Sequence, residues 1–235
     1  MHRHIFRLTY YKNISQFLDD GAIWAKNHYP MQQCYQTSYA TIVNRRGTTE
    51  FETPCGCVVN DFVAFYFSPV TAMSYTIHKG NVGLRGLDGV EIGVAKSDDI
   101  VFLVSNTRHF QNLGNNIYFT NVGCNSKAIV PEFKSDLLFL DEHINWALFD
   151  EIPKMAQISE IGYDGVRKYF LDRDDGIHKS RNSQRMAEFM VKNEVQLNFI
   201  DCIIVKNNQI KMKLELQMQG SDWNIPIYVK PGCYF

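Results

Sequence analysis

The amino-acid sequence predicts an α+β fold, and three observations support this class. Runs of β-branched and aromatic residues, which are typical of strands, occur in the first half of the chain and again in its last third. Helical patterns lie beside these runs, but strands and helices do not alternate regularly, as they would in a doubly wound parallel sheet. The 235 residues are 45% hydrophobic and contain no Gly-, Ser- or Pro-rich linker, which indicates one domain over residues 1–235.

The first expected element is a strand over 5–9, where apolar and polar residues alternate. Asn13 is a residue type favoured at helix N-termini, and Gln16 follows it by three positions. This spacing predicts a short helix that ends at Gly21. The segment 27–53 is polar and weakly periodic, so we expect a long loop-and-helix excursion that covers a site.

A second strand is expected over 58–67, which is dense in β-branched and aromatic residues. It stops at Ser68-Pro69, and proline fits the first turn of a helix. The sequence therefore predicts a strand that leads into a helix running through Met73 and Tyr75.

The rest of the chain is expected to hold a glycine-rich loop, several strands and one helix. The helix is predicted by apolar residues at helical spacing, and one of the later strands by strict alternation of apolar and polar residues from Ile210 to Met218. The expected elements are a loop over 80–93, strands over 100–104 and 117–120, a helix over 136–149, and strands over 199–205, 210–218 and 225–229.

Charge and cysteine content narrow the function classes. A formal net charge of −1 and a pI near 6.6 provide no overall attraction for nucleic acid, so such a substrate requires local basic patches. No apolar run reaches the roughly 18 residues of a membrane span. No signal peptide is recognised, so we expect a soluble cytoplasmic protein with reduced thiols. Cys55 and Cys57 are too closely spaced for an ordinary zinc half-site, and no metal is expected.

A carboxylate at the start of an apolar run is the strongest candidate for chemistry. Glu188 follows the cations Lys179, Arg181 and Arg185 and directly precedes three apolar residues. A glutamate at a buried edge beside cations suits the handling of a charged substrate. The alternative is a surface glutamate that pairs with Arg185.

The same three cations, together with Lys192, form the clearest local basic patch of the chain. Single-strand nucleic-acid binding requires cations combined with stacking surfaces. Such a combination is present in Lys179, Arg181, Arg185 and Lys192 together with Tyr169, Phe170 and His178. The alternative interpretation is a solvated face of the protein.

Four segments carry a resemblance that extends from Ile5 to Phe235. They are Arg7-Leu8-Thr9, the segment 61–69 with Met73, Ala187-Glu188-Phe189-Met190-Val191, and the ending Ile227-Tyr228-Val229-Lys230-Pro231-Gly232-Cys233-Tyr234-Phe235. These segments resemble the DarT family of DNA ADP-ribosyltransferase toxins. Met190 stands where the family has leucine.

The resemblance implies an ADP-ribosyltransferase-like α+β fold, with two small packed β-sheets flanked by helices and NAD in a cleft between them. It implies a toxin that transfers ADP-ribose from NAD to thymine or guanine of single-stranded DNA, releases nicotinamide and blocks replication. It also implies a DarG-like macrodomain antitoxin as a partner. Two alternatives remain open: transfer to RNA or protein, and a non-catalytic nucleic-acid-binding protein.

Two residues are implied to be catalytic. Cleavage of the bond between nicotinamide and ribose passes through an oxocarbenium-like state that a carboxylate stabilises, and the resemblance implies this role for Glu188. It implies that Arg46, or equally Arg45, activates the attacking base nitrogen. The alternative is a pair of solvated loop arginines, and Arg45 is also a candidate for NAD binding.

Further residues are implied to bind NAD. Tyr66 and Met73 match family positions that shape the NAD pocket, and Tyr66 is expected to face the site because Phe65 and Phe67, which alternate with it, face the core.

At the N-terminus, Thr9 matches the threonine of the family's His-x-Thr segment, while Arg7 stands in the histidine's place and suits pyrophosphate. Asn13 matches an asparagine at the start of the first helix in relatives, where its alternative role is an N-cap. Asn125 ends a segment in which relatives carry a histidine that is missing here. Together with Ala64 and Cys233, which replace a proline and a tryptophan, these departures indicate a divergent branch.

Overall fold

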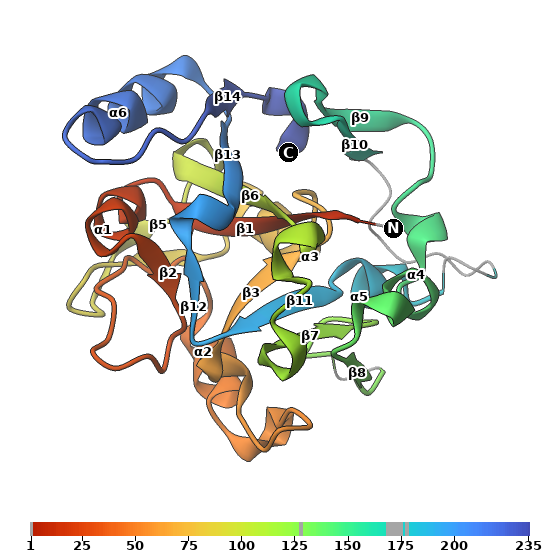
Figure 1. The fold of residues 1–235 in the computed structure, drawn as a ribbon. Coiled ribbons are helices and arrows are strands. Elements are labelled where there is room, and N and C mark those ends of the chain that lie inside the picture. Colours follow the sequence, from red (N-terminus) through yellow and green to blue (C-terminus); the bar gives the residue numbers. More distant parts are fainter. Residues whose placement is uncertain (1, 127–128, 168–175, 177–178) are drawn as a thin grey trace.

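A computed structural model of the protein describes residues 2–126, 129–167, 176 and 179–235 (Figure 1). This part of the chain contains an eight-stranded sheet in the order β14-β13-β6-β1-β3-β11-β7-β8, in which only β13 and β14 run parallel. The strands are β1 (His4–Tyr10), β3 (Phe62–Tyr66), β6 (Ile100–Asn106), β7 (Ile117–Thr120), β8 (Phe133–Lys134), β11 (Glu188–Lys192), β13 (Ile200–Val205) and β14 (Ile227–Val229).

The two middle strands hold the sheet together at a single position. β1 and β3 share one register pair, Phe6 with Tyr66, whereas β1 pairs with β6 along its whole length. The sheet thus consists of two four-stranded halves joined at one pair. The α+β class predicted from the sequence is confirmed, and the two small sheets expected by resemblance are present as joined halves of one sheet.

Small two-stranded sheets and helices surround this sheet. The pairs are β2 (Ala22–Trp24) with β12 (Glu194–Gln196), β4 (Gly83–Arg85) with β5 (Glu91–Val94), and β9 (Lys154–Ile158) with β10 (Tyr163–Val166). The α-helices are α1 (Asn13–Asp20), α2 (Ala40–Arg46), α3 (Ala72–His78), α4 (Leu140–His143), α5 (Arg181–Arg185) and α6 (Asn208–Gln219). Short 3₁₀ helices are η1 (Thr49–Phe51), η2 (Val59–Asp61), η3 (Ser97–Asp99), η4 (Thr107–Phe110), η5 (Gly114–Asn116), η6 (Leu137–Phe139), η7 (Trp146–Leu148), η8 (Ser159–Ile161), η10 (Leu197–Phe199) and η11 (Pro231–Cys233).

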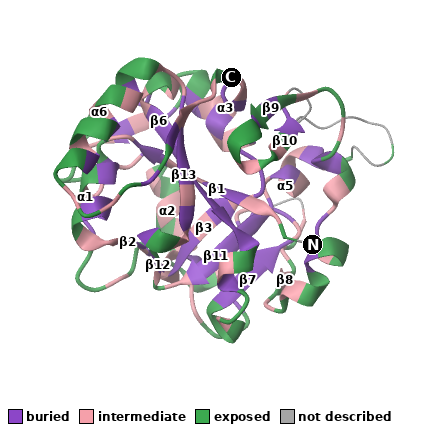
Figure 2. Cartoon of the chain, turned by 45° about the horizontal axis from the view of Figure 1, so that its top comes forward, coloured by how far each residue is buried: buried purple, intermediate pink, exposed green. Residues whose placement is uncertain are grey.

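Both faces of the sheet are covered, and β6 shows this most clearly because all seven of its residues are buried. Val101 and Leu103 face a core that includes the apolar sides of α1 and α6, two helices that pack against each other. Phe102 and Val104 face a second core with α3 and the C-terminal residues. Because successive side chains of β6 point to opposite faces of the sheet, this strand contributes residues to both cores. Figure 2 shows the central strands of the sheet mostly buried and the outer side of α6 exposed.

Most of the expected strands are confirmed with small shifts of their ends. The strands expected over 5–9, 100–104, 117–120, 199–205 and 225–229 correspond to β1, β6, β7, β13 and β14. The predicted helix from Asn13 is α1, and Gly21 ends it in the left-handed conformation (φ 67°) that glycine adopts at little cost. The excursion over 27–53 contains α2 and η1, as expected.

The strand predicted over 210–218 is wrong, because this segment is helix α6. Apolar residues at every second position include the set i, i+4 and i+8, which is also one face of a helix. Ile210, Leu214 and Met218 occupy this face and are buried, whereas Met212 and Leu216 are exposed. The side chain of the preceding Asn207 caps the helix by accepting a hydrogen bond from the Ile210 amide at 3.0 Å.

The helix predicted over 136–149 is also wrong as a continuous element. The buried positions Leu140, Ile144 and Leu148 have helical spacing, but Ile144 is extended (φ −97°, ψ 132°) and separates α4 from η7.

The expected loop over 80–93 contains most of the β4–β5 hairpin, and the helix expected at Pro69 begins at Ala72 with Thr71 as its cap. β3 begins at Phe62, after η2, and is therefore shorter than predicted. None of the described helices is long and apolar enough to cross a membrane.

Candidate active site

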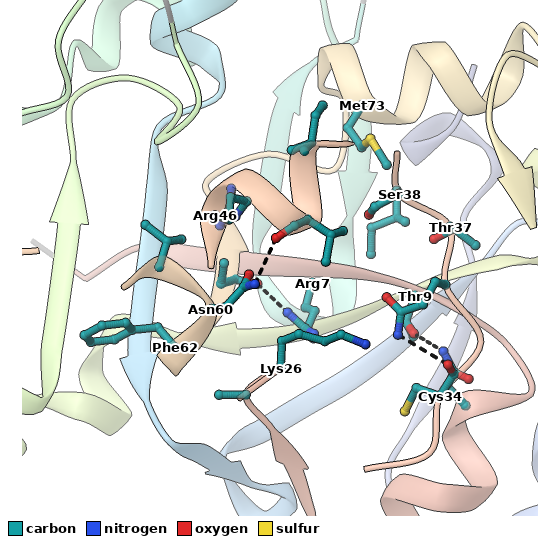
Figure 3. A pocket seen from close by; sticks show the side chains of 18 of the residues that line it. Arg7, Thr9, Lys26, Cys34, Thr37, Ser38, Arg46, Asn60, Phe62 and Met73 are labelled. Atoms are coloured by element: carbon teal, nitrogen blue, oxygen red, sulfur yellow. Dashed lines mark hydrogen bonds between the residues drawn. The ribbon is translucent and has the colours of Figure 1, made fainter. Parts of the chain in front are cut away.

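A pocket of about 230 Å³ opens where β1 and β3 diverge from their single pair (Figure 3). Residues 7–9 of β1 and residues 62, 64 and 66 of β3 line it, together with residues of α1, β2 and the excursion. Near the point of divergence, Arg7 Nη1 donates to the Ala64 carbonyl oxygen at 2.9 Å and bridges the two strands. The wedge between the sheet halves therefore forms the pocket.

Most of the residues that the sequence nominated for NAD or for chemistry meet in this pocket. The nominated residues that line it are Arg7, Thr9, Asn13, Arg46, Tyr66, Met73 and Asn125. Tyr66 faces the pocket while Phe65 and Phe67 are buried in the core, as the alternation along β3 predicts. Side chains from distant parts of the chain thus come together in one site.

Glu188 and Arg46 form a two-pronged ion pair at the wall of the pocket. Arg46 Nη1 donates to Glu188 Oε1 at 2.9 Å, and Arg46 Nη2 donates to Oε2 at 2.6 Å. The Cys124 amide donates to the same Oε1 at 3.0 Å. Glu188 is 0% exposed and the Arg46 side chain 14%, so Arg46 faces the pocket and Glu188 lies behind it.

Local structure explains how each partner is placed. Glu188 is the first residue of β11, where it pairs directly with Tyr66 of β3, and its amide donates to Thr120 Oγ1 at 3.1 Å. Arg46 is the last residue of α2. The carboxylate is therefore fixed by the rigid sheet, whereas the arginine is brought to it by the excursion.

Burial and charge set the pKa values of this group. Burial disfavours the charged form of Arg46, but the charge of Glu188 and its hydrogen bonds outweigh burial and raise the pKa of Arg46. Burial, and then the negative charge of Glu188, raise the pKa of the Tyr66 hydroxyl and of the Cys124 thiol. The site thus holds a permanent cation at its surface and neutral groups beside it.

Asn13 connects the excursion to β1. Its Nδ2 donates to Thr9 Oγ1 at 3.0 Å and to the Tyr35 carbonyl at 2.9 Å, while its Oδ1 accepts from the Tyr35 amide at 2.8 Å. Lys12 occupies the N-cap position of α1, so the N-cap role considered for Asn13 is wrong. Asn13 therefore joins two chain segments at the edge of the pocket.

Asn60 is a positioning residue that the sequence did not reveal. Its Nδ2 donates to the Val43 carbonyl of α2 at 2.9 Å, and it packs against Gly47, where an added Cβ would lie 3.0 Å from that nitrogen. This contact holds the end of α2 that carries Arg46. An asparagine just before a strand is so common in loops that no local signal distinguishes it.

Of the two candidate arginines, Arg46 reaches Glu188 and Arg45 does not. Arg45 does not line the pocket; its side chain pairs with Glu50, and its guanidinium carbon lies 5.1 Å from the ring centre of Phe51. Adjacent residues of a helix point in different directions, so Arg45 and Arg46 bind different partners.

The predicted basic patch is wrong for two of its four cations. Arg185 is 1% exposed and donates to the Leu148 carbonyl at 2.9 Å, to Ser68 Oγ at 2.9 Å and to the Val70 carbonyl at 3.1 Å. Burial lowers the pKa of its guanidinium to about 10.

Arg181 is likewise 1% exposed and donates to Glu151 at 2.5 Å. Both arginines thus stabilise the protein interior instead of presenting charge to a nucleic acid, and the alternative pair of Arg185 with Glu188 is also wrong. Lys179 is exposed. The aromatic partners proposed for this patch, Tyr169, Phe170 and His178, lie outside the described residues.

No cluster of three or more His, Cys, Asp or Glu side chains that could hold a metal ion is found in the described part of the chain. Cationic and neutral polar groups dominate the pocket instead. Besides Arg7 and Arg46, it is lined by Lys26. Such a lining suits an anionic, phosphate-bearing ligand.

A comparison with known protein families assigns the chain. The sequence model described as "ssDNA thymidine ADP-ribosyltransferase, DarT" matches residues 6–235. The chain belongs to the DarT family.

Relatives and solved DarT structures cover nearly the whole chain. A DNA ADP-ribosyl transferase of Escherichia coli O127:H6 (strain E2348/69 / EPEC) is 21% identical over 233 residues, which cover 98% of this chain and 93% of the relative. Thermus sp. 2.9 DarT in complex with ADP-ribosylated ssDNA superposes with a TM-score of 0.73 and 20% identity, covering 99% of this chain and 96% of the other.

Two further structures share the DarT fold. Thermus sp. 2.9 DarT in complex with NAD+ has a TM-score of 0.71 at 18% identity and covers 99% of this chain and 97% of the other. Thermosipho africanus DarTG in complex with ADP-ribose has a TM-score of 0.67 at 17% identity; it matches 99% of this chain, which spans about half (51%) of the DarTG chain.

Proposed function

We propose that this DarT-family enzyme transfers ADP-ribose from NAD to thymine in single-stranded DNA, with residues 1–235 acting as one catalytic domain. The observation that carries the proposal is the two-pronged ion pair of Glu188 and Arg46 at the wall of a cation-lined pocket. The family assignment and the Thermus complexes with NAD+ and with ADP-ribosylated ssDNA support it. NAD and template DNA are both cytoplasmic in bacteria, and we place the enzyme there.

NAD binds in the wedge between β1 and β3 under this proposal. Arg7 and Lys26 contact the pyrophosphate, because guanidinium and ammonium groups form strong charge-assisted hydrogen bonds with phosphate oxygens. Tyr66 provides an aromatic face for a base or for nicotinamide, and Met73 fills the space beside it. Thr9 contacts the ligand from β1, with Asn13 orienting its hydroxyl.

The chemistry breaks one bond and forms one. The bond between nicotinamide and ribose breaks, nicotinamide leaves with the bonding electrons, and positive charge develops on the ribose. The carboxylate of Glu188 stabilises this charge. A nitrogen of the base then attacks the anomeric carbon and loses its proton to the surrounding solvent. Arg46 orients the base at the pocket surface and stabilises negative charge that forms on it.

The ion pair gives the two residues linked roles. In the described arrangement, Glu188 accepts hydrogen bonds from Arg46 and from the Cys124 amide, so the carboxylate is held in one place before substrate arrives. When Arg46 turns towards the base, the carboxylate becomes available to the ribose. Preorganised charge of this kind costs no rearrangement of solvent during the reaction.

DNA and the antitoxin contact other surfaces. We infer that DNA approaches the pocket at Asn125, which lines it, with the exposed Lys179 contacting phosphate. A DarG-like macrodomain protein, which the resemblance implies and the DarTG neighbour supports, is the proposed antitoxin. Because it removes ADP-ribose from DNA, it would reverse the toxic modification.

The experiment that tests the proposal is mass spectrometry of single-stranded oligonucleotides, each containing one reactive base, after incubation with NAD. We expect the mass of one ADP-ribose to be added to thymine alone, and Glu188→Gln to lower the rate by about 10²-fold or more, since it removes the stabilising charge. Glu215→Gln, on the exposed side of α6, is the matched control and should react normally.

Three outcomes distinguish the alternatives. A gain on guanine would keep the mechanism but change the base. Modification of RNA or protein in the absence of any DNA product would assign another acceptor. No product on any acceptor would leave a non-catalytic nucleic-acid-binding protein, and the transferase proposal would then be abandoned.

A further inference from the structure

A pair of cysteines lies in a tight turn at the end of the excursion, outside the pocket. In Cys55-Gly56-Cys57, the Gly56 amide donates to the Thr53 carbonyl at 2.9 Å, and the Thr53 amide donates to the Cys57 carbonyl at 2.8 Å. Gly56 has a φ of 73°, in the left-handed region that glycine tolerates best. The turn therefore holds two cysteines close together at the protein surface.

Polar groups of the turn and of the sheet lie around the two sulfur atoms. The Cys57 thiol donates to the Cys55 carbonyl oxygen at 3.9 Å, and Thr53 Oγ1 lies 3.3 Å from Cys55 Sγ. Lys192, at the end of β11, acts on Cys57, and Tyr118 of β7 lies close enough to Cys55 for the two groups to affect each other's pKa. A cation and hydroxyl groups thus surround the pair, as in sites that stabilise a thiolate.

The two thiols differ in acidity because each acts on the other. Burial acts to raise the pKa of Cys55, but the Cys57 and Thr53 side chains outweigh burial and hold that pKa below the usual value. The neighbouring Cys55 thiol raises the pKa of Cys57. The nucleophilic thiolate is therefore the exposed Cys55, and Cys57 retains the proton.

The other cysteines lack these properties. Cys34 is half-buried, and burial raises its pKa to about 11. Cys124, Cys202 and Cys233 are buried, and burial raises the pKa of each. Structural cysteines of this kind are chemically inert, which makes the surface pair the distinct case.

We propose that Cys55 and Cys57 form a redox-active dithiol that a small disulfide such as oxidised glutathione converts to an intramolecular disulfide. The Cys55 thiolate attacks one sulfur of oxidised glutathione, which releases one glutathione thiolate and forms a mixed disulfide. Cys57 then loses its proton to solvent, and its sulfur attacks Cys55 Sγ and displaces the second glutathione. The protein loses two electrons and two protons, and one disulfide is reduced to two thiols.

Lys192 is a positioning residue for this reaction, because its ammonium group stabilises negative charge on either sulfur. It is the last residue of β11, the strand that begins with Glu188, so the dithiol lies over the opposite end of the catalytic strand. The proposal concerns thiol chemistry alone. Its failure would therefore leave the transferase proposal untouched.

The test uses the full-length reduced protein and oxidised glutathione, with trypsin digestion and mass spectrometry at timed intervals. Cleavage after Arg46 and Lys79 releases segment 47–79, whose only cysteines are Cys55 and Cys57. We expect this segment to lose two hydrogens well before Cys34 acquires glutathione. In Cys57→Ser the reaction should stop at the mixed disulfide on Cys55, and Lys192→Met should slow the first step severalfold.

Two results would overturn the proposal. One is the accumulation of glutathione on both cysteines without loss of two hydrogens, which would mean that the turn does not allow ring closure. The other is a rate of reaction at Cys55 equal to that at Cys34, which would mean that the surrounding groups do not activate it. Cys34→Ser, with its wild-type surface pair, is the control and should form the disulfide at the normal rate.

Discussion

Glu188 and Arg46 are 142 residues apart in the sequence and 2.6 Å apart in the fold. Each of the two residues was a candidate on its own, because of its residue type and its neighbours in the sequence. The sequence could not show that they bind each other, and the partner considered for Glu188 was Arg185, only three positions away. Long-range pairing brings β11 next to β3, and Arg46 reaches the carboxylate from the end of α2, so a local pattern cannot indicate this partner.

Arg46→Lys tests the two-pronged geometry at the residue scale. Lysine keeps the charge but offers a point donor in place of the planar fork, so it cannot donate to both carboxylate oxygens in parallel. We expect the rate of transfer to DNA to fall by roughly 10²-fold. The matched variant is Arg45→Lys, which alters the neighbouring residue outside the pocket. Equal losses in both variants would show that helix α2, and not the ion pair, is responsible.

Arg185→Met tests the interior role that replaces the predicted DNA contact. The variant leaves the Leu148 carbonyl without the Arg185 donor, removes one of the donors to the Val70 carbonyl and to Ser68 Oγ, and empties the volume that the buried guanidinium filled. We expect the free energy of unfolding to fall by about 3 kcal/mol, measured by urea denaturation. Lys179→Met, at an exposed position, should change it by less than about 0.5 kcal/mol. If Arg185→Met were neutral while DNA binding fell, the residue would be a DNA contact after all.

At the scale of elements, α6 shows where sequence patterns become ambiguous. Strict alternation from Ile210 to Met218 fits a strand with one apolar face and also contains a helical face of every fourth residue. Tertiary packing against α1 selects the helix, and the Asn207 cap starts it. The segment 136–149 shows the opposite case. Its buried residues have helical spacing, but the helix is interrupted at Ile144.

Alanine substitution of two leucines distinguishes helix from strand in α6. As a strand, Leu214 and Leu216 would lie on the same face, whereas in the helix Leu214 is 0% exposed and Leu216 is 67% exposed. We expect Leu214→Ala to lower the free energy of unfolding by about 3 kcal/mol and Leu216→Ala by less than about 0.5 kcal/mol. Urea denaturation with an unchanged slope is the measurement, and similar losses for both would contradict the helix.

At the scale of the whole molecule, NAD should stabilise the fold because its proposed pocket exists only when both halves of the sheet are joined. Ligand at 100 times its Kd adds about 2.7 kcal/mol. For a chain of this size we expect a rise in Tm of about 5 to 10 °C, measured by thermal unfolding.

Arg7→Gln should weaken this NAD-dependent shift while leaving the Tm without ligand nearly unchanged. Gln removes the cation proposed for the pyrophosphate and keeps a polar amide donor at this position. Glu215→Gln serves again as the control. No shift with NAD in the wild-type protein would support the non-catalytic alternative.

The sequence by itself determined the α+β class, most of the strands, the start and end of α1, and several of the residues that line the pocket. These features depend on local periodicity, on turn chemistry and on a resemblance extending over the chain. Only the tertiary structure decided which arginine meets Glu188, that Arg181 and Arg185 are buried, and that 210–218 is a helix. The physical reason is that burial and charge pairing depend on segments far apart in the chain, whose approach is set by sheet pairing and core packing.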